Sequence, residues 1–279
     1  MTATLSFIVP VRHPANAKNW ASLKHHLGQT LNSIASQTHA GWRGLVVANH
    51  GADLPPMPPG FEVEWVDFPP NRLHERGDAT KEEFYEAFRL DKGRRVLAGL
   101  LRARDSAYFM VVDDDDFVSR QLTGFVTAHH GAPGWFFKTG LVWTDGSRGP
   151  LYRHPSFASL CGTSHIIRAD LYELPASAAA ASEAYIKQRL GSHIFIEELL
   201  AQRGTPLAPL PFAGAVYRIG HAGAHSGSMG VVRTFVLKRR NFEVPMSLLR
   251  ALLRLRPLTP SVRQEFFGAP AAVSGRRSS

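Results

Sequence analysis

The chain has 279 residues, of which 44% are hydrophobic and 20% charged, so it is a globular protein with room for one large α/β domain, alone or with a tail. Its formal net charge of +9 is concentrated at one end, because ten Lys or Arg against two Glu between residues 231 and 279 account for +8. The rest of the chain is nearly neutral, which argues against a nucleic-acid-binding body.

The cysteine content and the N-terminal segment indicate a compartment. Cys161 is the single cysteine, so an internal disulfide is excluded and a reducing environment is favoured. Residues 1–5 lack the charged and apolar regions of a secretory signal, and no apolar run is long enough to span a bilayer. We therefore expect a cytoplasmic protein.

The first part of the chain alternates apolar runs with helical patterns. Strands are predicted over residues 5–11, 44–48 and 61–66, and apolar residues from Trp20 to Ile34 recur at helical spacing. This order predicts a mainly parallel sheet flanked by helices and joined by right-handed crossovers.

A second helical pattern runs from Gly77 to Asp105. Thr80 and Glu83 are spaced as a capping box at its start. The Asp91-Lys92-Gly93 step predicts a division into two helices.

The later elements are shorter. We expect a strand or hairpin over 135–143, a glycine turn and strand over 161–168, a helix or loop over 176–184, a helix over 192–204 and a last strand over 212–219.

Leucines interleaved with arginines between Leu248 and Arg256 predict a short basic amphipathic helix. Such a helix can lie on an anionic membrane surface at the inner face of the membrane, or pack on its own domain with its arginines reaching water. Residues 272–279 are expected to be disordered.

Four carboxylates, Asp113 to Asp116, directly follow the apolar run that begins at Tyr108. The run reads as a buried strand, and open α/β sheets bind ligands at this edge. Adjacent carboxylates repel one another unless a hard divalent cation neutralises part of the charge. Strand alternation predicts Asp113 and Asp115 on one side and Asp114 and Asp116 on the other. The alternative is a solvated acidic turn that begins a helix at Ser119.

Segments 7–11, 33–38, 45–48 and 112–119 occur in the order seen in glycosyltransferases of the GT-A fold, and together they resemble most the inverting family-two group. The resemblance covers roughly residues 4–225. It implies an α/β GT-A domain over 1–230, with 231–279 as a basic extension. It also implies metal-dependent transfer of a sugar from a nucleotide diphosphate donor, with a UDP-sugar favoured, to a glycan or lipid-linked acceptor in glycan or cell-surface polysaccharide synthesis.

The resemblance implies that Asp113 and Asp115 form the Asp-x-Asp pair that binds Mn²⁺ or Mg²⁺, with Asp115 as direct ligand and Asp116 as supporting acid. His221 and His225 lie in a glycine-rich loop after the last strand. Both are candidates for contact with the metal or the diphosphate, and His221 is preferred.

The resemblance also places several residues along the nucleotide sugar, namely Pro10, Val11, Arg12, Asn49, Lys92, Arg95, Asp113 and Asp114. Family members frequently have an acidic residue where this chain has Asn49, so the identity of the donor's nucleobase stays open. Lys92 and Arg95 are candidates for phosphate contacts, and ordinary surface solvation is their alternative role.

An inverting transfer needs a base for the acceptor hydroxyl. Residues 196–204 resemble the family's acidic pair at a helix start, followed by Arg and Gly, with Glu197 in place of the usual Asp. Glu198 and His193 are alternatives, and so is an exposed helical acid without a catalytic role. The turn at 162–164 resembles the loop on the acceptor side.

Three alternative functions place other requirements on the sequence. A nucleotidyltransferase also uses clustered acids and a metal, but it would need a glycine-rich loop after the first strand. A haloacid-dehalogenase-like phosphatase would need Thr where Phe117 stands. A non-catalytic binding protein could keep the fold without turnover.

Overall fold

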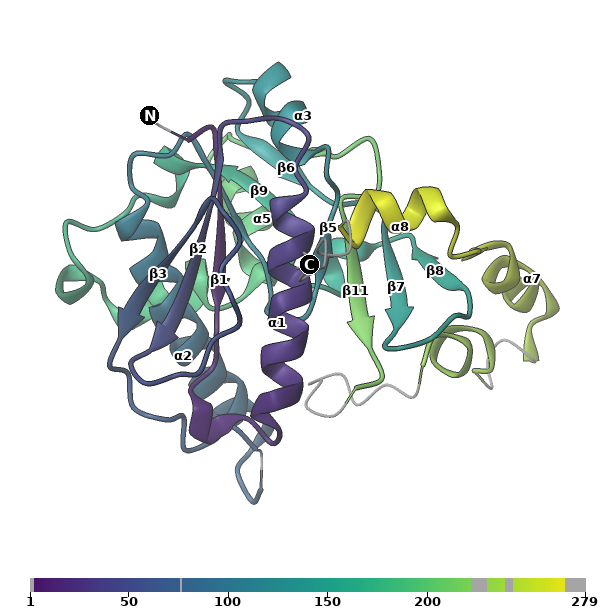
Figure 1. Cartoon of the computed structure of the whole chain (residues 1–279), viewed down its shortest axis with the longest axis horizontal. Coiled ribbons are helices and arrows are strands. Elements are labelled where there is room, and N and C mark those ends of the chain that lie inside the picture. Colours follow the sequence, from purple (N-terminus) through teal and green to yellow (C-terminus); the bar gives the residue numbers. More distant parts are fainter. Residues whose placement is uncertain (1–2, 76, 222–229, 239–242, 269–279) are drawn as a thin grey trace, which may run out of the picture.

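The computed structural model describes residues 3–75, 77–221, 230–238 and 243–268. It has a mixed α/β architecture with two sheets flanked by helices (Figure 1). The α/β architecture expected from the sequence is confirmed. Among the helices described, none has the length and hydropathy of a bilayer-spanning segment.

The described strands are β1 (Leu5–Pro10), β2 (Trp42–Asn49), β3 (Phe61–Val66), β4 (Tyr108–Val111), β5 (Phe117–Val118), β6 (Gly134–Phe136), β7 (Gly140–Thr144), β8 (Leu151–His154), β9 (His165–Arg168), β10 (Ala208–Pro209), β11 (Ala215–Ile219) and β12 (Leu255–Arg256). The α-helices are α1 (Trp20–Ala35), α2 (Lys81–Arg102), α3 (Leu122–Ala128), α4 (Glu183–Tyr185), α5 (His193–Gln202), α7 (Pro245–Leu253) and α8 (Pro260–Phe266). Short 3₁₀ or π-helical turns are η1 (Pro14–Asn16), η2 (Phe157–Ser159), η3 (Ala169–Tyr172), η4 (Ala178–Ala180), η5 (Ile186–Leu190) and η6 (Val232–Val236).

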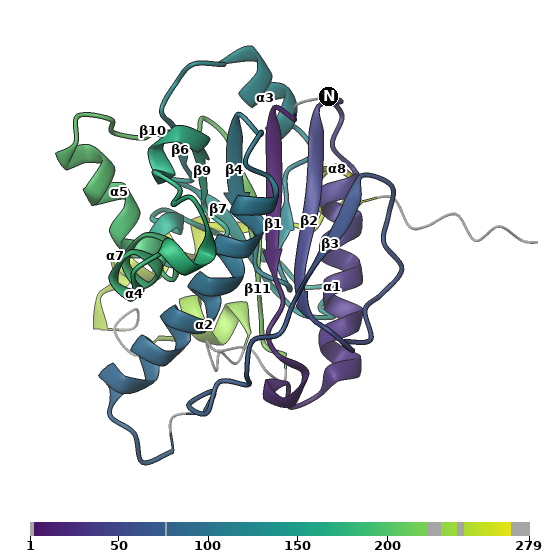
Figure 2. The ribbon, with the colours of Figure 1, turned by 90° about the vertical axis from the view of Figure 1, so that its left-hand side faces the viewer.

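The larger sheet has the order β10-β6-β9-β4-β1-β2-β3. Strands β4, β1, β2 and β3 run parallel, as the sequence predicts, whereas β9 is antiparallel to both β4 and β6. Figure 2 shows α1 and α2 on opposite sides of β1 and β2. Phe7 and Val9 belong to the core cluster of α1, while Ile8 belongs to that of α2. Both faces of β1 are therefore covered, which explains its uninterrupted apolar sequence.

Helix α2 is continuous, so the prediction of two helices divided at residues 91–93 is wrong. Its start is fixed by the predicted capping box of Thr80 and Glu83. Gly93 allows another segment to approach, because an added Cβ would lie 2.6 Å from the carbonyl oxygen of Ile186. The glycine serves the packing of α2 against η5 and does not break the helix.

The second sheet has the order β12-β8-β7-β11-β5. The segment expected as one strand or hairpin over 135–143 is divided between the sheets. After β6 the chain turns, the ring of Phe137 enters the main core, and β7 begins in the second sheet. Pairing between distant segments decides this arrangement, as when β7 pairs with β11.

The segment after residue 230, expected as an extension, contributes to the second sheet in its described part. Strand β12 pairs antiparallel with β8. Helix α8 places Phe266 in a cluster with Phe117 of β5. Residues 269–279, which include the predicted disordered end, lie outside the described part.

Candidate functional site

A cavity of about 490 Å³ opens where β1 and β4 end. Its wall carries the basic side chains of Arg12, Arg89, Lys92 and Arg95 and the acidic side chains of Asp91, Asp113, Asp114 and Asp115. The cavity has both signs of charge at the edge of the sheet where α/β proteins bind ligands.

The four consecutive aspartates point to different partners, so the prediction of two alternating sides is wrong. Strand β4 ends at Val111, and the acids lie in the turn beyond it, where strand geometry no longer applies. Asp113, Asp114 and Asp115 line the cavity, whereas Asp116 does not.

Lys92 on α2 forms an ion pair with Asp113 in the cavity wall. Burial alone would lower the pKa of Lys92, but the adjacent Asp113 raises it above its usual value. Gly162 leaves room for this pair, because an added Cβ would lie 2.7 Å from Asp113 Oδ2 and 3.1 Å from Lys92 Nζ. The glycine of the turn predicted on the acceptor side thus makes space for a charged pair.

Asp114 faces Arg12, with 4.0 Å between Oδ1 and the guanidinium. Burial raises the pKa of Asp114 to about 6, although the charge of Arg12 opposes the shift. Asp114 therefore gains or loses a proton near neutral pH, depending on which charges stand beside it.

Asp116 is completely buried (0% exposed). It accepts hydrogen bonds from Thr163 Oγ1 at 2.6 Å, Cys161 Sγ at 3.2 Å and the backbone N–H of Arg218 at 3.1 Å. Burial, reinforced by neighbouring acids, raises its pKa well above the ordinary value. The structure therefore places the predicted supporting acid in the interior, where it ties three segments together.

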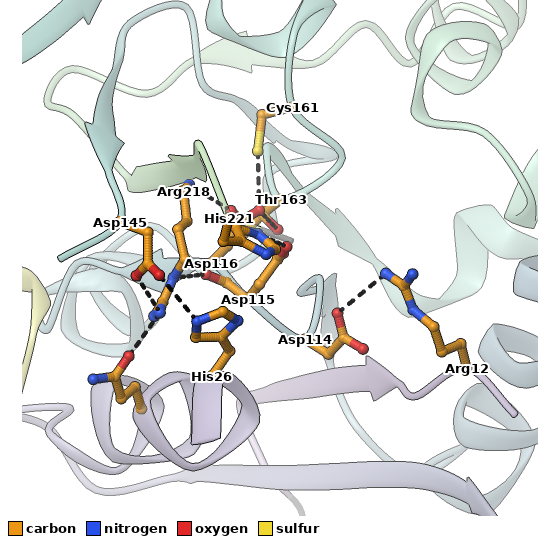
Figure 3. A network of polar contacts seen from close by, with 11 residues as sticks. Arg12, His26, Asp114, Asp115, Asp116, Asp145, Cys161, Thr163, Arg218 and His221 are labelled. Carbon is orange, nitrogen blue, oxygen red and sulfur yellow. Dashed lines mark hydrogen bonds and ion pairs between the residues drawn. The ribbon is translucent and has the colours of Figure 1, made fainter. Parts of the chain in front are cut away.

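Asp115 belongs to a chain of polar contacts that enters the protein interior (Figure 3). His221 Nε2 lies 2.9 Å from Asp115 Oδ2, and the ring of His26 lies edge-on to that of His221. His26 Nε2 is 3.2 Å from Asp145 Oδ2, and Asp145 Oδ1 is 3.1 Å from Arg218 Nη1. Burial by itself would raise the pKa of Asp115, but the hydrogen bond and charge of His221 lower it.

Arg218 on β11 closes this chain, and the sequence reading did not identify it. It is fully buried, and its guanidinium lies 4.5 Å from the ring centre of Phe117. Its Nε donates to the carbonyl oxygen of Asp115 at 2.8 Å. A lone Arg in an apolar strand is its only sequence signal.

Asp115 and His221 could supply two of the ligands that a divalent cation needs. Asp115 Oδ2 and His221 Nε2, which are 2.9 Å apart in a hydrogen bond, are a carboxylate oxygen and an imidazole nitrogen, and both atom types can ligate a divalent cation. No group of three or more His, Cys, Asp or Glu with metal-site geometry occurs among the described residues. The described side chains would thus supply two ligands, and phosphate oxygens and water the others. His225, the other predicted histidine, lies outside the described residues.

The residues predicted along the nucleotide sugar divide into two groups. Those that line the cavity are Pro10, Arg12, Lys92, Arg95, Asp113 and Asp114. Val11 is buried in the core, and Asn49 is also buried.

Arg95 lines the cavity, but it is almost fully buried and is held in place by Asn49 and Asp91. Arg95 Nη1 donates to Asn49 Oδ1 at 2.7 Å, and its Nη2 lies 3.1 Å from Asp91 Oδ1. The amide of Asn49 donates to the carbonyl oxygen of Phe68 at 2.7 Å. Arg95 therefore holds β2 and α2 in place, while Lys92 is the more available cation.

The three candidate bases lie on α5 in different surroundings. His193 lines the cavity, and burial lowers its pKa to about 4, with the charge of Lys92 adding to the shift. Glu197 is one turn further along the helix and contacts His165. Glu198 is exposed and accepts from Gln202 Nε2 at 3.2 Å.

His165 was missed by the sequence reading, although it follows the predicted glycine turn. Ser164 Oγ donates to the carbonyl oxygen of Cys161 at 2.6 Å, so it can only accept from His165 Nδ1, 3.1 Å away. His165 Nε2 then faces Glu197 Oε2 at 3.2 Å.

A scan against protein-family models finds no match for this chain, and a search of curated proteins finds none. Among solved structures, residues 1–349 of S. aureus TarS are similar, with 15% identity and a TM-score of 0.44 over 78% of this chain and 60% of that one. A longer S. aureus TarS structure gives 14% identity and a TM-score of 0.39 over 79% of this chain and 37% of that one. Rv0371C from Mycobacterium tuberculosis H37Rv, solved in complex with manganese, gives 12% identity and a TM-score of 0.35 over 78% of this chain and 92% of that one. This chain spans less than two thirds of both TarS structures, and likeness at these low scores carries no argument about its activity.

Proposed function

We propose that the chain transfers a glycosyl group from a nucleotide diphosphate sugar to an acceptor hydroxyl with the help of a divalent cation. The observation that supports this proposal is a cavity of about 490 Å³ that brings Arg12 and Lys92 together with the acidic turn. A diphosphate needs cationic partners, and carboxylates next to a diphosphate need a cation between them.

The cation would be held by Asp115 and His221, with Asp113 beside them. When bound, it would stabilise the negative charge that develops on the departing diphosphate. Mn²⁺ and Mg²⁺ both accept carboxylate oxygens, and a histidine nitrogen as second ligand favours Mn²⁺.

Lys92 would contact the diphosphate directly. It stays protonated because Asp113 raises its pKa. When a diphosphate enters, the ammonium group can keep one N–H on Asp113 and turn another toward a phosphate oxygen, since Lys has three donors.

Glu197 is our candidate for the base of an inverting transfer. It follows His193, a cavity residue, by four positions and so lies on the same face of α5. His165 orients its carboxylate from the adjacent strand. A base held in this way can take the proton of the acceptor hydroxyl as the bond to the sugar forms.

A nucleotidyltransferase is the second candidate, because the same cations and acids would suit a nucleoside triphosphate. The two reactions differ in their products, since sugar transfer releases a nucleoside diphosphate and nucleotidyl transfer releases pyrophosphate. A binding protein without turnover would release neither.

Thermal stabilisation tests the first step. Nucleoside diphosphates and their sugar conjugates should raise the melting temperature only when Mn²⁺ or Mg²⁺ is also added, because ligands that bind the native state stabilise it. Donor turnover with release of nucleoside diphosphate would then support sugar transfer. Stabilisation by no nucleotide, with or without metal, would refute the proposal.

A further inference from the structure

Helix α7 presents an apolar face to solvent. Four of its five Met and Leu side chains, Met246, Leu249, Leu252 and Leu253, are between 47% and 65% exposed. At 100° per residue these four side chains fall within an arc of about 120°. Ala251, on the other side of the helix, is the buried residue. We call these four residues the α7 face.

The helix is fixed to the second sheet, with this face pointing outward. Strand β12 follows α7 almost directly, and its Leu255 pairs with Tyr152 of β8. Arg254 Nη1 lies 3.3 Å from the hydroxyl of Tyr152, which gives a second link. In Figure 1, α7 lies at the far end of the molecule from β3. The α7 face is therefore a property of the folded domain.

The charge around the α7 face is mainly positive. Residues 243–256 contain three Arg and one acidic residue, Glu243, at the start. Arg250 follows Met246 by one turn, and Arg256 Nη1 donates to the carbonyl oxygen of Leu253 at 2.7 Å, so both charges flank the face. Directly after the neighbouring η6, Leu237 is exposed, and Lys238 lies 5.3 Å from the ring centre of Phe235 in η6. A partner that fits this surface is both apolar and anionic.

We propose that the α7 face inserts into the headgroup region of an anionic lipid bilayer. Leucine side chains would enter the boundary of the acyl chains, while the flanking arginines meet lipid phosphates. A second copy of the chain fits less well, because a nine-residue helix is about 14 Å long and offers far less than a standard interface of about 800 Å² per partner. The arginines would also face their own copies across a twofold axis.

Vesicle flotation of the full chain tests this inference independently of the proposed activity. We expect binding to phosphatidylcholine vesicles with about 30% phosphatidylglycerol, and at least about tenfold weaker binding to phosphatidylcholine alone. The variant Leu249→Glu with Leu253→Glu should lose the binding while keeping its circular dichroism spectrum and melting temperature, because both side chains are exposed. Arg250→Ala should weaken binding by about fivefold, the effect of one basic residue near an anionic surface.

Arg102→Glu is the matched control. It changes the net charge by the same amount as the double leucine variant, but in α2, outside the α7 face. This variant should bind vesicles like the wild type. Failure of the wild type to float with anionic vesicles, or equal flotation of the double leucine variant, would overturn the inference. A concentration-dependent dimer that the double variant abolishes would show that a second copy covers the face instead.

Discussion

His165 on β9 and Glu197 on α5 are in contact, with 3.2 Å between Nε2 and Oε2, although 32 residues separate them in the chain. This pair connects the sheet to the helix whose first turn lines the cavity. In the proposed sugar transfer, Glu197 would act from this position as the base for the acceptor hydroxyl.

Glu197→Gln should lower glycosyl transfer by a factor of roughly 10² or more, the scale of a lost general base. Donor affinity, measured by the metal-dependent thermal shift, should change little. Glu198→Gln is the matched control, because Glu198 is exposed and contacts only Gln202 among the partners described for it, and its transfer rate should equal that of the wild type. A collapse of donor affinity in Glu197→Gln would show that Glu197 binds the donor.

Asp115→Asn should abolish the extra stabilisation that Mn²⁺ gives to a nucleoside diphosphate complex. The fold should persist, because the amide oxygen can still accept a hydrogen bond from His221, while one negative ligand is lost. Asp170→Asn serves as the control, since Asp170 is an exposed acid paired with Arg168. Equal Mn²⁺-dependent shifts in the wild type and Asp115→Asn would remove Asp115 from the metal site.

His26 should make the protein less stable in acid. Burial lowers its pKa to about 4, and the charge of Arg218 adds to this shift, against Asp145 and Asp115. The unfolded chain therefore binds a proton near pH 6.5 that the folded protein takes up only near pH 4, so stability is lost as the pH falls through this window. Between pH 7 and pH 4.5, the wild type should therefore lose about 2 kcal/mol more of its unfolding free energy than His26→Gln does.

Urea denaturation at both pH values measures this difference. Asp114, whose pKa is about 6, titrates in both proteins and cancels in the comparison. A free-energy difference that does not change with pH would show that His26 has an ordinary pKa.

Gly93→Ala should destabilise the protein by roughly 1–3 kcal/mol, the range for overpacking. Helix propensity alone predicts a gain of about 1 kcal/mol, but the new Cβ would lie 2.6 Å from the carbonyl oxygen of Ile186. Gly124→Ala in α3 is the matched control, because its Cβ would meet only His39 Cβ at 3.6 Å. The free energy of unfolding of Gly124→Ala, measured in urea, should equal that of the wild type or be slightly higher. A higher free energy of unfolding for Gly93→Ala would contradict the packing role of Gly93.

The sequence predicted the elements that local patterns determine. Strand β3 has the predicted bounds, and β1, α1 and β2 differ from prediction only near their ends. The apolar residues of these segments are buried where the sheet and its helices pack together. Burial repeats along each segment with the period of a strand or a helix, so the sequence shows it directly. The capping box at Thr80 was predicted for the same reason, since it involves residues three apart.

The second sheet could not be predicted, because its pairing joins distant and very short segments. β12 begins at Leu255 and pairs with Tyr152, and β5 has only two residues. Gly93 was misread because its role depends on Ile186, far away in the sequence.

The candidate site was predicted unevenly for a similar reason. Residue type and position were enough to identify the acidic turn, which follows a predicted strand, and Lys92, which lies on a predicted helix. The burial of Asp116 and the contact between His165 and Glu197 depend on the packing of segments far apart in the chain, and no spacing in the sequence reveals them.

The acidic turn is one of several covalent connections between the two sheets, since β4 precedes it and β5 follows it. Asp113 is tied through Lys92 to the helix over the first sheet, and Asp115 is tied to His221 at the end of β11 in the second. A change in the angle between the two sheets would therefore change the separation of Asp113 and Asp115, and with it the cation site proposed above.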